Sequence, residues 1–488
     1  MVRGESAAST GLSFRLCYWM QMYRMGTALG CGVLGAMLSS CSEGSGFRTY
    51  GEPGSARGSV YEPGVSDDQA PAGRPPPLAG SVRPPPFTEG LRVCPPESDP
   101  RVSGMTVGTQ SALDALEGCE RIDHDFTISA FVGMDLTPLR SLREVRGRLT
   151  IGNEYTLAGP PVLSLEGLEG LRHLRGLTLH GLQVSDLSSL RDLEWLGKPT
   201  DGDFGIGGPA LRITGAAQLV DLHGLEDVQG IYGLLVLECP NLRSLEGVHF
   251  AQDPEGWGGI YVSDSPVQSF GDLSALTQIG TLALSHSPLE SLEGLRSLRR
   301  IQFVSLSQNE QLEDVELLAQ LDQLQVLELQ LNPRLTTVPD LPLLSEMSAV
   351  QLRSNHALVR APAVPGITAL NELTVNDNPA LERLDGFAAL HQLGEGYVSG
   401  NERLGGLDLA SLAEITRTLY VIGNPQLDVN LLLGSAPAQS GHLKANGNLG
   451  EQDLLAPCPW PDDDVCDEPP DHGLCAPGTD PICELTDG

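Results

Sequence analysis

A short pattern of apolar positions recurs along the chain from about residue 126 to 448. Each unit opens with two apolar residues separated by one other residue, which is the alternation of a strand with one buried face. Beyond the strand, apolar residues tend to fall at every third position. This spacing is shorter than the about 3.6 residues of an α-helical turn, so it predicts an extended or 3₁₀ return segment.

The unit repeats regularly enough to predict a solenoid. Successive opening residues are 22 to 34 positions apart, and most intervals are 22 to 25. A period of about 20 to 29 Leu-rich residues is typical of solenoids, in which each coil buries its apolar face against its neighbours. We therefore expect a parallel β-solenoid of about 14 coils with little α-helix. The opening residues are Phe126, Leu149, Leu177, Leu211, Leu235, Ile260, Leu282, Val304, Leu327, Val350, Leu373, Gly396, Leu419 and Leu443.

An asparagine recurs five positions after the opening residue in the later units. We expect its amide to hydrogen-bond the backbone of the turn that leaves each strand. Stacked identical coils need the same turn chemistry, so we interpret these asparagines as a structural ladder rather than as ligands. They are Asn309, Asn332, Asn355, Asn378, Asn401, Asn424 and Asn448.

Two stretches carry a more specific phrase, Leu292-Glu-Gly-Leu295-Arg-Ser-Leu298 and Leu165-Glu-Gly-Leu168-Glu-Gly-Leu171. The unit resembles a leucine-rich repeat, and more closely the receptor L-domain variety, over about residues 94–448. An L domain has about half as many coils and is usually followed by a furin-like cysteine-rich module, which is absent here. One continuous array and two fused L-like halves both remain open, and bacterial internalin-type repeats are the near alternative.

The same resemblance implies an N-terminal cap over residues 94–125, with a disulfide between Cys94 and Cys119, ahead of the repeat array at 126–448. Cys239 is expected to be a small buried hydrophobe with a free thiol. In an oxidising compartment the remaining cysteines predict two disulfides in the tail, residues 449–488, with three connectivities open. The tail cysteines are Cys458, Cys466, Cys475 and Cys483.

The N-terminal region predicts export and a lipid anchor. An uncharged run over residues 27–38 has the length of a signal-peptide apolar core. The tetrad Leu38-Ser39-Ser40-Cys41 then resembles the lipobox of bacterial lipoproteins, which implies lipidation of Cys41 and removal of the peptide before it. Residues 1–41 are thus expected to be a lipoprotein signal peptide, over-extended at its start. Acylation at one residue by two or three chains anchors a protein stably.

The residue after the lipobox cysteine is Ser42 rather than Asp. By resemblance to lipoprotein sorting in double-membraned bacteria, this favours the outer membrane, with the body periplasmic or surface-exposed. Residues 42–93 are rich in Gly, Pro, Ser and Arg and predict an extended tether between anchor and body.

Charge and motifs restrict the function. The chain has 63 acidic and 30 basic side chains and a formal net charge of −33. Such a surface repels phosphate backbones, so we expect no nucleic-acid partner and membrane contact only through the lipid anchor. The sequence lacks a His-Glu-x-x-His, Gly-x-Ser-x-Gly, Walker or EF-hand motif. We therefore expect no enzymatic activity, no cofactor and no metal site in the array.

The tail is strongly acidic and faintly resembles Notch-type cysteine repeats, which implies calcium binding through carboxylates. The third disulfide and the closing Asp-Gly-Gly-Asp phrase of that family are missing. We therefore favour an acidic disulfide-stapled cap on the last coil, with a calcium-dependent adhesion module as the alternative. The candidate calcium ligands are Asp462, Asp463, Asp464, Asp467, Glu468 and Asp480.

The strand face is the candidate binding surface. Residues one and three positions after each opening residue should point outward. At the coil that opens at Leu235, this rule places Val236 and Glu238 outward. Tyr397 and Tyr420 fall on adjacent rungs about 5 Å apart, beside Arg353, and exposed aromatic and Arg side chains are typical of binding hot spots. The candidate ligand-binding residues are Tyr261, Glu328, Gln330, Gln351, Arg353, Asn376, Tyr397 and Tyr420.

These features together predict a lipid-anchored cell-surface protein of the envelope. It would bind an envelope or extracellular protein or glycan through the strand face of its solenoid. The alternatives are a structural spacer of the cell surface and calcium-dependent adhesion through the tail.

Overall fold

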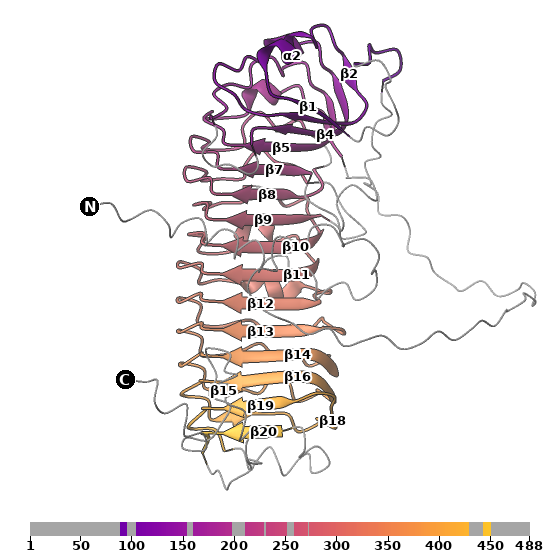
Figure 1. Ribbon diagram of the computed structural model, residues 1–488. Helices are drawn as coiled ribbons and strands as arrows, with labels where there is room; N and C mark the ends of the chain where they lie inside the picture. Colours follow the sequence, from indigo (N-terminus) through magenta and orange to yellow (C-terminus); the bar gives the residue numbers. More distant parts are fainter. Residues whose placement is uncertain are drawn as a thin grey trace, which may run out of the picture. The chain divides into compact units, whose positions relative to one another are not determined.

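The computed structural model describes residues 88–94, 104–153, 160–197, 210–228, 231–250, 258–271, 273–428 and 443–449. The predicted signal peptide with Cys41, most of the tether, and the acidic tail with its four cysteines lie outside these residues. The described residues form a parallel β-solenoid of about 13 turns, which confirms the predicted fold class (Figure 1). Among them no helix is long and apolar enough to cross a membrane.

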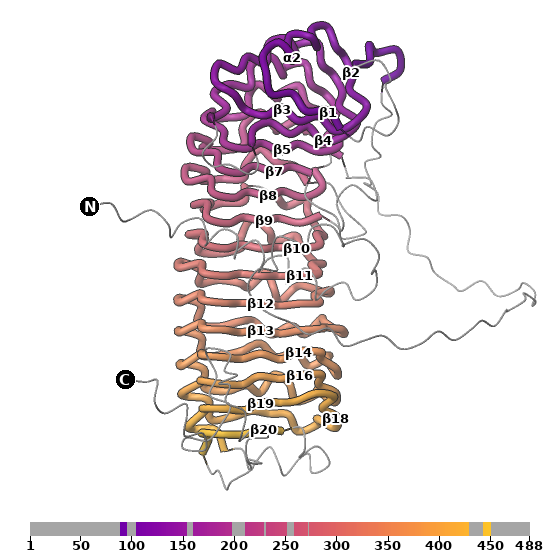
Figure 2. Tube along the Cα trace, in the orientation of Figure 1, coloured from indigo at the N-terminus to yellow at the C-terminus, as the bar shows by residue number. Residues whose placement is uncertain are grey.

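The strands of the main sheet stack along the solenoid, and each strand pairs in parallel with the next (Figures 1 and 2). In spatial order the strands are β1 (Gly104–Val107), β3 (Asp125–Ile128), β4 (Glu144–Ile151), β5 (His173–His180), β7 (Leu211–Thr214), β8 (Leu234–Leu237), β9 (Gly259–Ser263), β10 (Gln278–Ser285), β11 (Arg300–Ser307), β12 (Val326–Gln330), β13 (Ala349–Arg353), β14 (Ala369–Asn376), β16 (Gln392–Ser399), β19 (Leu419–Ile422) and β20 (Leu443–Asn446).

The return side of the coils is extended or 3₁₀, as the three-residue spacing predicts. The one α-helix in the described part of the chain is the short α2 (Gln110–Asp114) in the cap. The 3₁₀ segments are η1 (Thr137–Leu139), η2 (Ser188–Leu190), η3 (Glu293–Leu295) and η4 (Glu316–Gln320), and the remaining short strands are β2 (Arg121–Ile122), β6 (Trp195–Leu196), β15 (Arg383–Leu384), β17 (Gly406–Leu407) and β18 (Glu414–Ile415).

The core is a continuous aliphatic column. In β12, for example, the inward residues Leu327 and Leu329 are fully buried, and so are the return-side residues Leu335, Val338 and Leu341 of the same coil. The apolar residues that recur at every second position on the strand and at every third position on the return side are therefore buried in one common core. Each coil closes this column only against the coils above and below it.

The buried asparagines connect neighbouring coils. Asn378 Oδ1 accepts the backbone N–H of Asn355 at 3.0 Å, and Asn378 Nδ2 donates to the Leu352 carbonyl at 2.9 Å. Nδ2 also donates to the carbonyl of Asn376 in its own coil at 2.9 Å. The two bonds between coils recur from Asn309 to Asn448, and the bond within the coil recurs at Asn424 and Asn448. The predicted ladder is confirmed, but its side chains bridge coils as well as their own turns.

The coil that contains β8 corrects the predicted register. Leu234 and Val236 are fully buried, whereas Leu235 and Leu237 lie on the outer face. Ile213 of β7 pairs with Val236, so the prediction that Val236 points outward is wrong, and the register of β8 is shifted by one residue. Glu238 follows the strand and is half-buried. The Leu-Leu-Val-Leu run is apolar at every position, so alternation cannot set its register, and a slip of one residue exchanges the faces.

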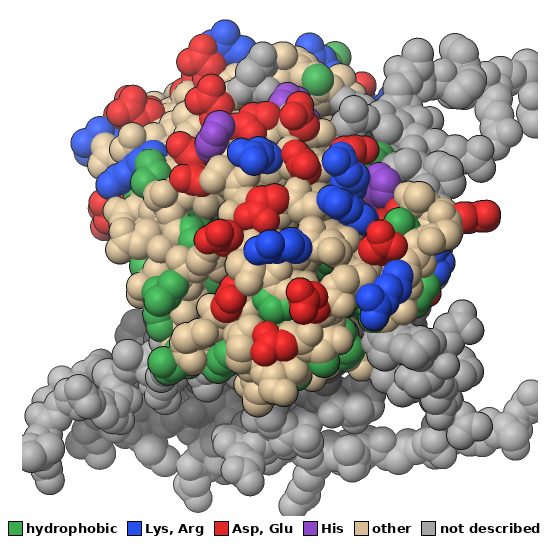
Figure 3. Space-filling model, turned by 90° about the horizontal axis from the view of Figure 1, so that it is seen from above, with side chains coloured by type: hydrophobic (Ala, Val, Ile, Leu, Met, Phe, Trp, Pro, Cys, Tyr) green, Lys and Arg blue, Asp and Glu red, His purple; other side chains and the backbone are tan. Residues whose placement is uncertain are grey.

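The end of the predicted tether contacts the first coils of the array. The backbone N–H of Thr88 donates to Glu144 Oε1 at 2.8 Å, and His173 Nδ1 lies 3.3 Å from the same oxygen. The backbone N–H of Cys94 donates to the Arg121 carbonyl at 2.9 Å. Seen onto the end that carries α2 and β2, the surface shows many charged side chains of both signs, with apolar ones scattered among them (Figure 3). A polar outer face is what the terminal coil of a solenoid requires.

Replacing a ladder asparagine should destabilise the solenoid strongly. Asn378→Ala leaves the Asn355 N–H and the Leu352 carbonyl buried without their partner, and each such loss costs about 1 to 3 kcal/mol. We expect a loss of about 2 to 4 kcal/mol in the free energy of unfolding, measured by chemical denaturation. The control is Asn371→Ala, an exposed residue of the same coil region, for which we expect a change within about 0.5 kcal/mol. Equal midpoints for the two variants would contradict a ladder that stabilises the fold.

The Glu144 contact should give the N-terminal end of the solenoid an acid-sensitive stability. Glu144 is 1% exposed. Burial opposes its ionisation, but hydrogen bonds from Thr88 and His173 outweigh burial and lower the pKa of Glu144. A carboxyl with a lowered folded-state pKa contributes stability above its ordinary pKa and loses it as the pH falls through the folded value. When the pH is lowered from neutral to below the ordinary carboxyl pKa, the free energy of unfolding should therefore fall more for wild type than for Glu144→Gln.

The measurement is the denaturation midpoint at both pH values. At neutral pH Glu144→Gln should be about 1 to 2 kcal/mol less stable than wild type. Glu310→Gln, at an exposed position, is the control and should follow wild type. A Glu144→Gln variant with the wild-type acid dependence would show that this carboxylate does not hold the segment.

Candidate functional site on the strand face

The outward side chains of β11 to β20 form one surface, which we call the C-terminal strand face. Because the strands are in register, equivalent residues of successive coils stand in rows about 4.8 Å apart. The face comprises Ser305, Ser307, Glu328, Gln330, Gln351, Arg353, Glu372, Thr374, Asn376, Glu395, Tyr397, Ser399, Tyr420, Ile422, Lys444 and Asn446.

Two tyrosines stack at the centre of its C-terminal part. The rings of Tyr397 and Tyr420 have centroids 4.9 Å apart and planes inclined by 11°, as expected from their adjacent rungs. The Tyr397 hydroxyl donates to Glu395 Oε1 at 2.8 Å. Burial, with this bond and the charge of Glu395, raises the pKa of Tyr397. The ring is therefore held in one orientation and stays neutral.

Glu372, on the strand next to that of Tyr397, connects side chains of β13 and β14. Its Oε1 accepts Gln351 Nε2 at 2.9 Å and the Thr374 hydroxyl at 2.9 Å. Arg353 lies 3.7 Å from the same oxygen. These contacts join two neighbouring strands, β13 and β14, so the polar side chains of this region are ordered before any ligand arrives.

The other carboxylates of the face also have partners. Glu395 Oε2 lies 3.1 Å from Arg417, which precedes β19. Glu328 accepts the Ser305 hydroxyl at 3.0 Å and is only 3% exposed. Burial raises the pKa of Glu328, and the nearby charge of Arg353 acts against that rise. Glu328 thus supports its neighbours and offers little surface to a partner.

The structure separates Tyr261 from the other predicted site residues. Tyr261 is 6% exposed, and its ring packs over Gly259, where a Cβ would lie 2.8 Å from the ring. It lies on β9, six strand steps from Tyr397, which is roughly 29 Å. Its burial contradicts the prediction that Tyr261 is an exposed ligand-binding residue of the strand face. A glycine in its own strand leaves room for the ring to fold onto the sheet.

The remaining predicted residues stay on the face but differ in exposure. Gln330, Gln351, Arg353 and Tyr420 are half-buried, whereas Asn376 is 8% exposed.

Sequence reasoning missed three residues of the network, Glu372, Glu395 and Arg417. Glu372 and Glu395 stand two positions before Thr374 and Tyr397 on the same face. Extending the alternation backwards by one step along β14 and β16 would have found both glutamates. Arg417 lies outside any strand, and its role depends on its distance to Glu395 in the folded coil.

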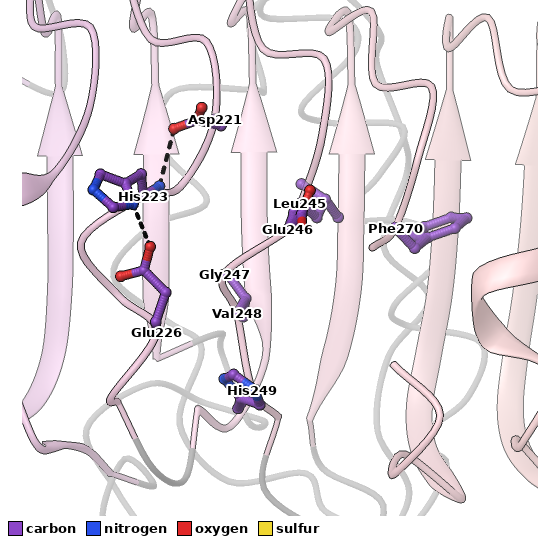
Figure 4. Close-up of a pocket in the computed structure, with 9 residues that line it drawn as sticks. All are labelled: Asp221, His223, Glu226, Leu245, Glu246, Gly247, Val248, His249 and Phe270. Atoms are coloured by element: carbon purple, nitrogen blue, oxygen red, sulfur yellow. Dashed lines mark hydrogen bonds and ion pairs between the residues drawn. The ribbon is translucent and has the colours of Figure 1, made fainter. Parts of the chain in front are cut away.

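A concavity on the return side, between the coils that carry β7 to β9, is the second candidate site. Its volume is about 420 Å³. Figure 4 shows His223 and Glu226 directed toward each other, with His249 apart from them. Glu226 also accepts the Gly224 N–H at 2.8 Å, and Asp221 accepts the His223 N–H at 3.0 Å. The lining residues are Asp221, His223, Glu226, Leu245, Glu246, Gly247, Val248, His249 and Phe270.

Asp221 and Glu226 therefore hydrogen-bond backbone N–H groups of their own turns. Throughout the described ranges, no three His, Cys, Asp or Glu side chains are placed to hold a metal ion. The strand face, with its shared network, is the better candidate site.

The described cysteines are free thiols. The Cys119 side chain hydrogen-bonds Cys94, and burial, followed by that bond, raises the pKa of Cys119 to about 12. A disulfide between them stays a prediction. Cys239 is fully buried, as expected, and burial raises its pKa to about 11. It occupies the ladder position of its coil, and its N–H donates to Ser265 Oγ at 3.0 Å.

No protein-family model matches the chain, and no curated protein matches it significantly. The function is therefore inferred from the geometry of the strand face.

The pKa of Tyr397 should depend on Glu395. We expect its hydroxyl to ionise above the ordinary tyrosine pKa in wild type. In Glu395→Gln the pKa should fall, because the acceptor carboxylate and its negative charge are gone. Ultraviolet-difference titration, with Tyr397→Phe to assign the signal, measures this. Arg334→Gln, on the return side, should leave the titration unchanged. An unshifted pKa in Glu395→Gln would show that Glu395 does not hold the ring in solution.

Proposed function

We propose that this protein is a recognition protein that binds an envelope or extracellular protein or glycan through its C-terminal strand face. The observation that carries the proposal is the stacked Tyr397–Tyr420 pair, in which the Tyr397 hydroxyl is hydrogen-bonded to Glu395 and Glu395 forms an ion pair with Arg417. Amphipathic aromatic residues beside Arg are enriched where binding energy concentrates. A surface ordered in advance also loses little conformational entropy when a partner binds.

The rigid solenoid supports this proposal. Tyr397 and Glu395 stand on one strand, and Glu372 and Tyr420 on the strands at either side. Sites built on strands keep their geometry better than sites on loops. The face needs no chemistry of its own to act as a binding surface, so we propose no enzymatic activity.

We further propose that the repeat is of the leucine-rich or receptor L-domain type. Three features support this: the Leu-x-Gly-Leu phrases, the asparagine ladder, and a cysteine, Cys239, at the ladder position of one coil. The sequence around Cys41 supports a lipid-anchored protein of the cell envelope, at the outer membrane. The predicted disulfides, Cys94–Cys119 and two in the tail, belong to the same proposal.

Removing the tyrosine pair should abolish partner binding. The whole protein is immobilised beside Tyr397→Ala/Tyr420→Ala and used to retain material from the envelope extract of its own organism. Wild type should retain a protein or polysaccharide, and the double variant should lose it by at least about tenfold, as expected for hot-spot truncations above about 1.4 kcal/mol.

The matched control is Leu343→Ala/Val359→Ala, which removes exposed apolar side chains outside the strands. It should behave as wild type. Equal retention by all three proteins, or by none, contradicts recognition through this face and favours the spacer role. Retention lost on chelation of calcium but unaffected by the tyrosines would instead support adhesion through the tail.

A further inference from the structure

The last two strands of the face place an aromatic ring, an aliphatic side chain, an amide and an ammonium group together. Tyr420 pairs in register with Lys444, and Ile422 pairs with Asn446. Val421 and Ala445, which alternate with them, are 0% and 1% exposed. The four side chains therefore point outward, and Lys444 is exposed.

The free ring face of Tyr420 is directed along this row. Tyr397 covers one face of the Tyr420 ring, because the two rings are nearly parallel. The opposite face is directed toward the β20 side, where Lys444 is the register neighbour. Adjacent strands are about 4.8 Å apart and alternate residues about 6.6 Å apart. The four side chains thus mark a patch about the size of one pyranose ring.

The charge of this region differs from that of the whole chain. Glu372 and Glu395 have arginine partners, at 3.7 and 3.1 Å. Among the described residues Lys444 forms no ion pair, so its positive charge has no carboxylate partner there, although the chain as a whole carries −33. Charges farther away than the Debye length, about 8 Å at physiological ionic strength, are largely screened. Close to the face, Lys444 therefore favours an anionic group.

We propose that this end of the strand face binds an acidic sugar residue of a glycan. The apolar face of the pyranose stacks on the Tyr420 ring beside Ile422, its carboxylate pairs with the Lys444 ammonium, and the Asn446 amide binds a hydroxyl group. This inference rests on the proposed recognition function and specifies its ligand. A neutral sugar would leave Lys444 unused, and a purely apolar partner would leave both Lys444 and Asn446 without a partner.

The test uses the whole protein and two probes, an oligogalacturonate and its carboxyl-reduced oligomer of equal length, in calorimetric titrations. Wild type should bind the acidic oligomer at least about fivefold more tightly than the reduced one, as a partly exposed ion pair of about 1 kcal/mol provides. Lys444→Gln should lose this preference, and Lys444→Arg should keep it. Tyr420→Ala should weaken both oligomers, whereas Tyr420→Phe should bind them as wild type does.

Arg334→Gln removes one exposed positive charge from the return side and is the matched control. If both oligomers bind wild type equally, or if Lys444→Gln differs from wild type no more than Arg334→Gln does, the acidic-sugar site is overturned. If wild type binds no oligogalacturonate while envelope material is still retained through the tyrosines, the sugar assignment is wrong and recognition by the face stands. If the Tyr397→Ala/Tyr420→Ala variant retains envelope material as well as wild type does, recognition through the strand face is overturned.

Discussion

Hydrogen bonding between coils by buried asparagine side chains is the constraint on which the later half of the solenoid depends. Each Asn from 309 to 448 accepts a backbone N–H from the coil before it and donates to a carbonyl of that coil. Asn332 and Asn378 are fully buried, so the turns must repeat at the same place for these groups to be paired. The ladder therefore holds neighbouring strands in equal register.

Equal register is what creates the candidate site. It brings Tyr397 over Tyr420 and places Glu372 within reach of Gln351, which are contacts between residues 21 to 23 positions apart. In a parallel solenoid, the side chain of an outward residue contacts the side chain at the equivalent position of the next coil. Two such neighbouring residues are therefore enough to form a contact pair on the surface. These outward positions do not pack in the core, so their residues can change the binding chemistry while the fold is retained.

The earlier coils use other residues at the ladder position, and their faces differ. Cys239, Ser265 and Ser287 replace Asn there, and Ser265 Oγ still accepts the Cys239 N–H. The shorter side chains make fewer bonds between coils. In this part of the sheet the outer face carries Leu235 and Leu237 and a buried Tyr261, rather than a charged network.

The sequence by itself determined the repeat period, the alternation of buried and outward residues in most strands, the ladder and the adjacency of Tyr397 and Tyr420. These follow from local spacing, because a coil repeats its own chemistry. Only the tertiary structure decided the register of β8, the burial of Tyr261 and Glu328, and the roles of Glu372, Glu395 and Arg417. Those outcomes depend on which side chains of neighbouring coils fill the same space, and no single unit of the sequence contains that information.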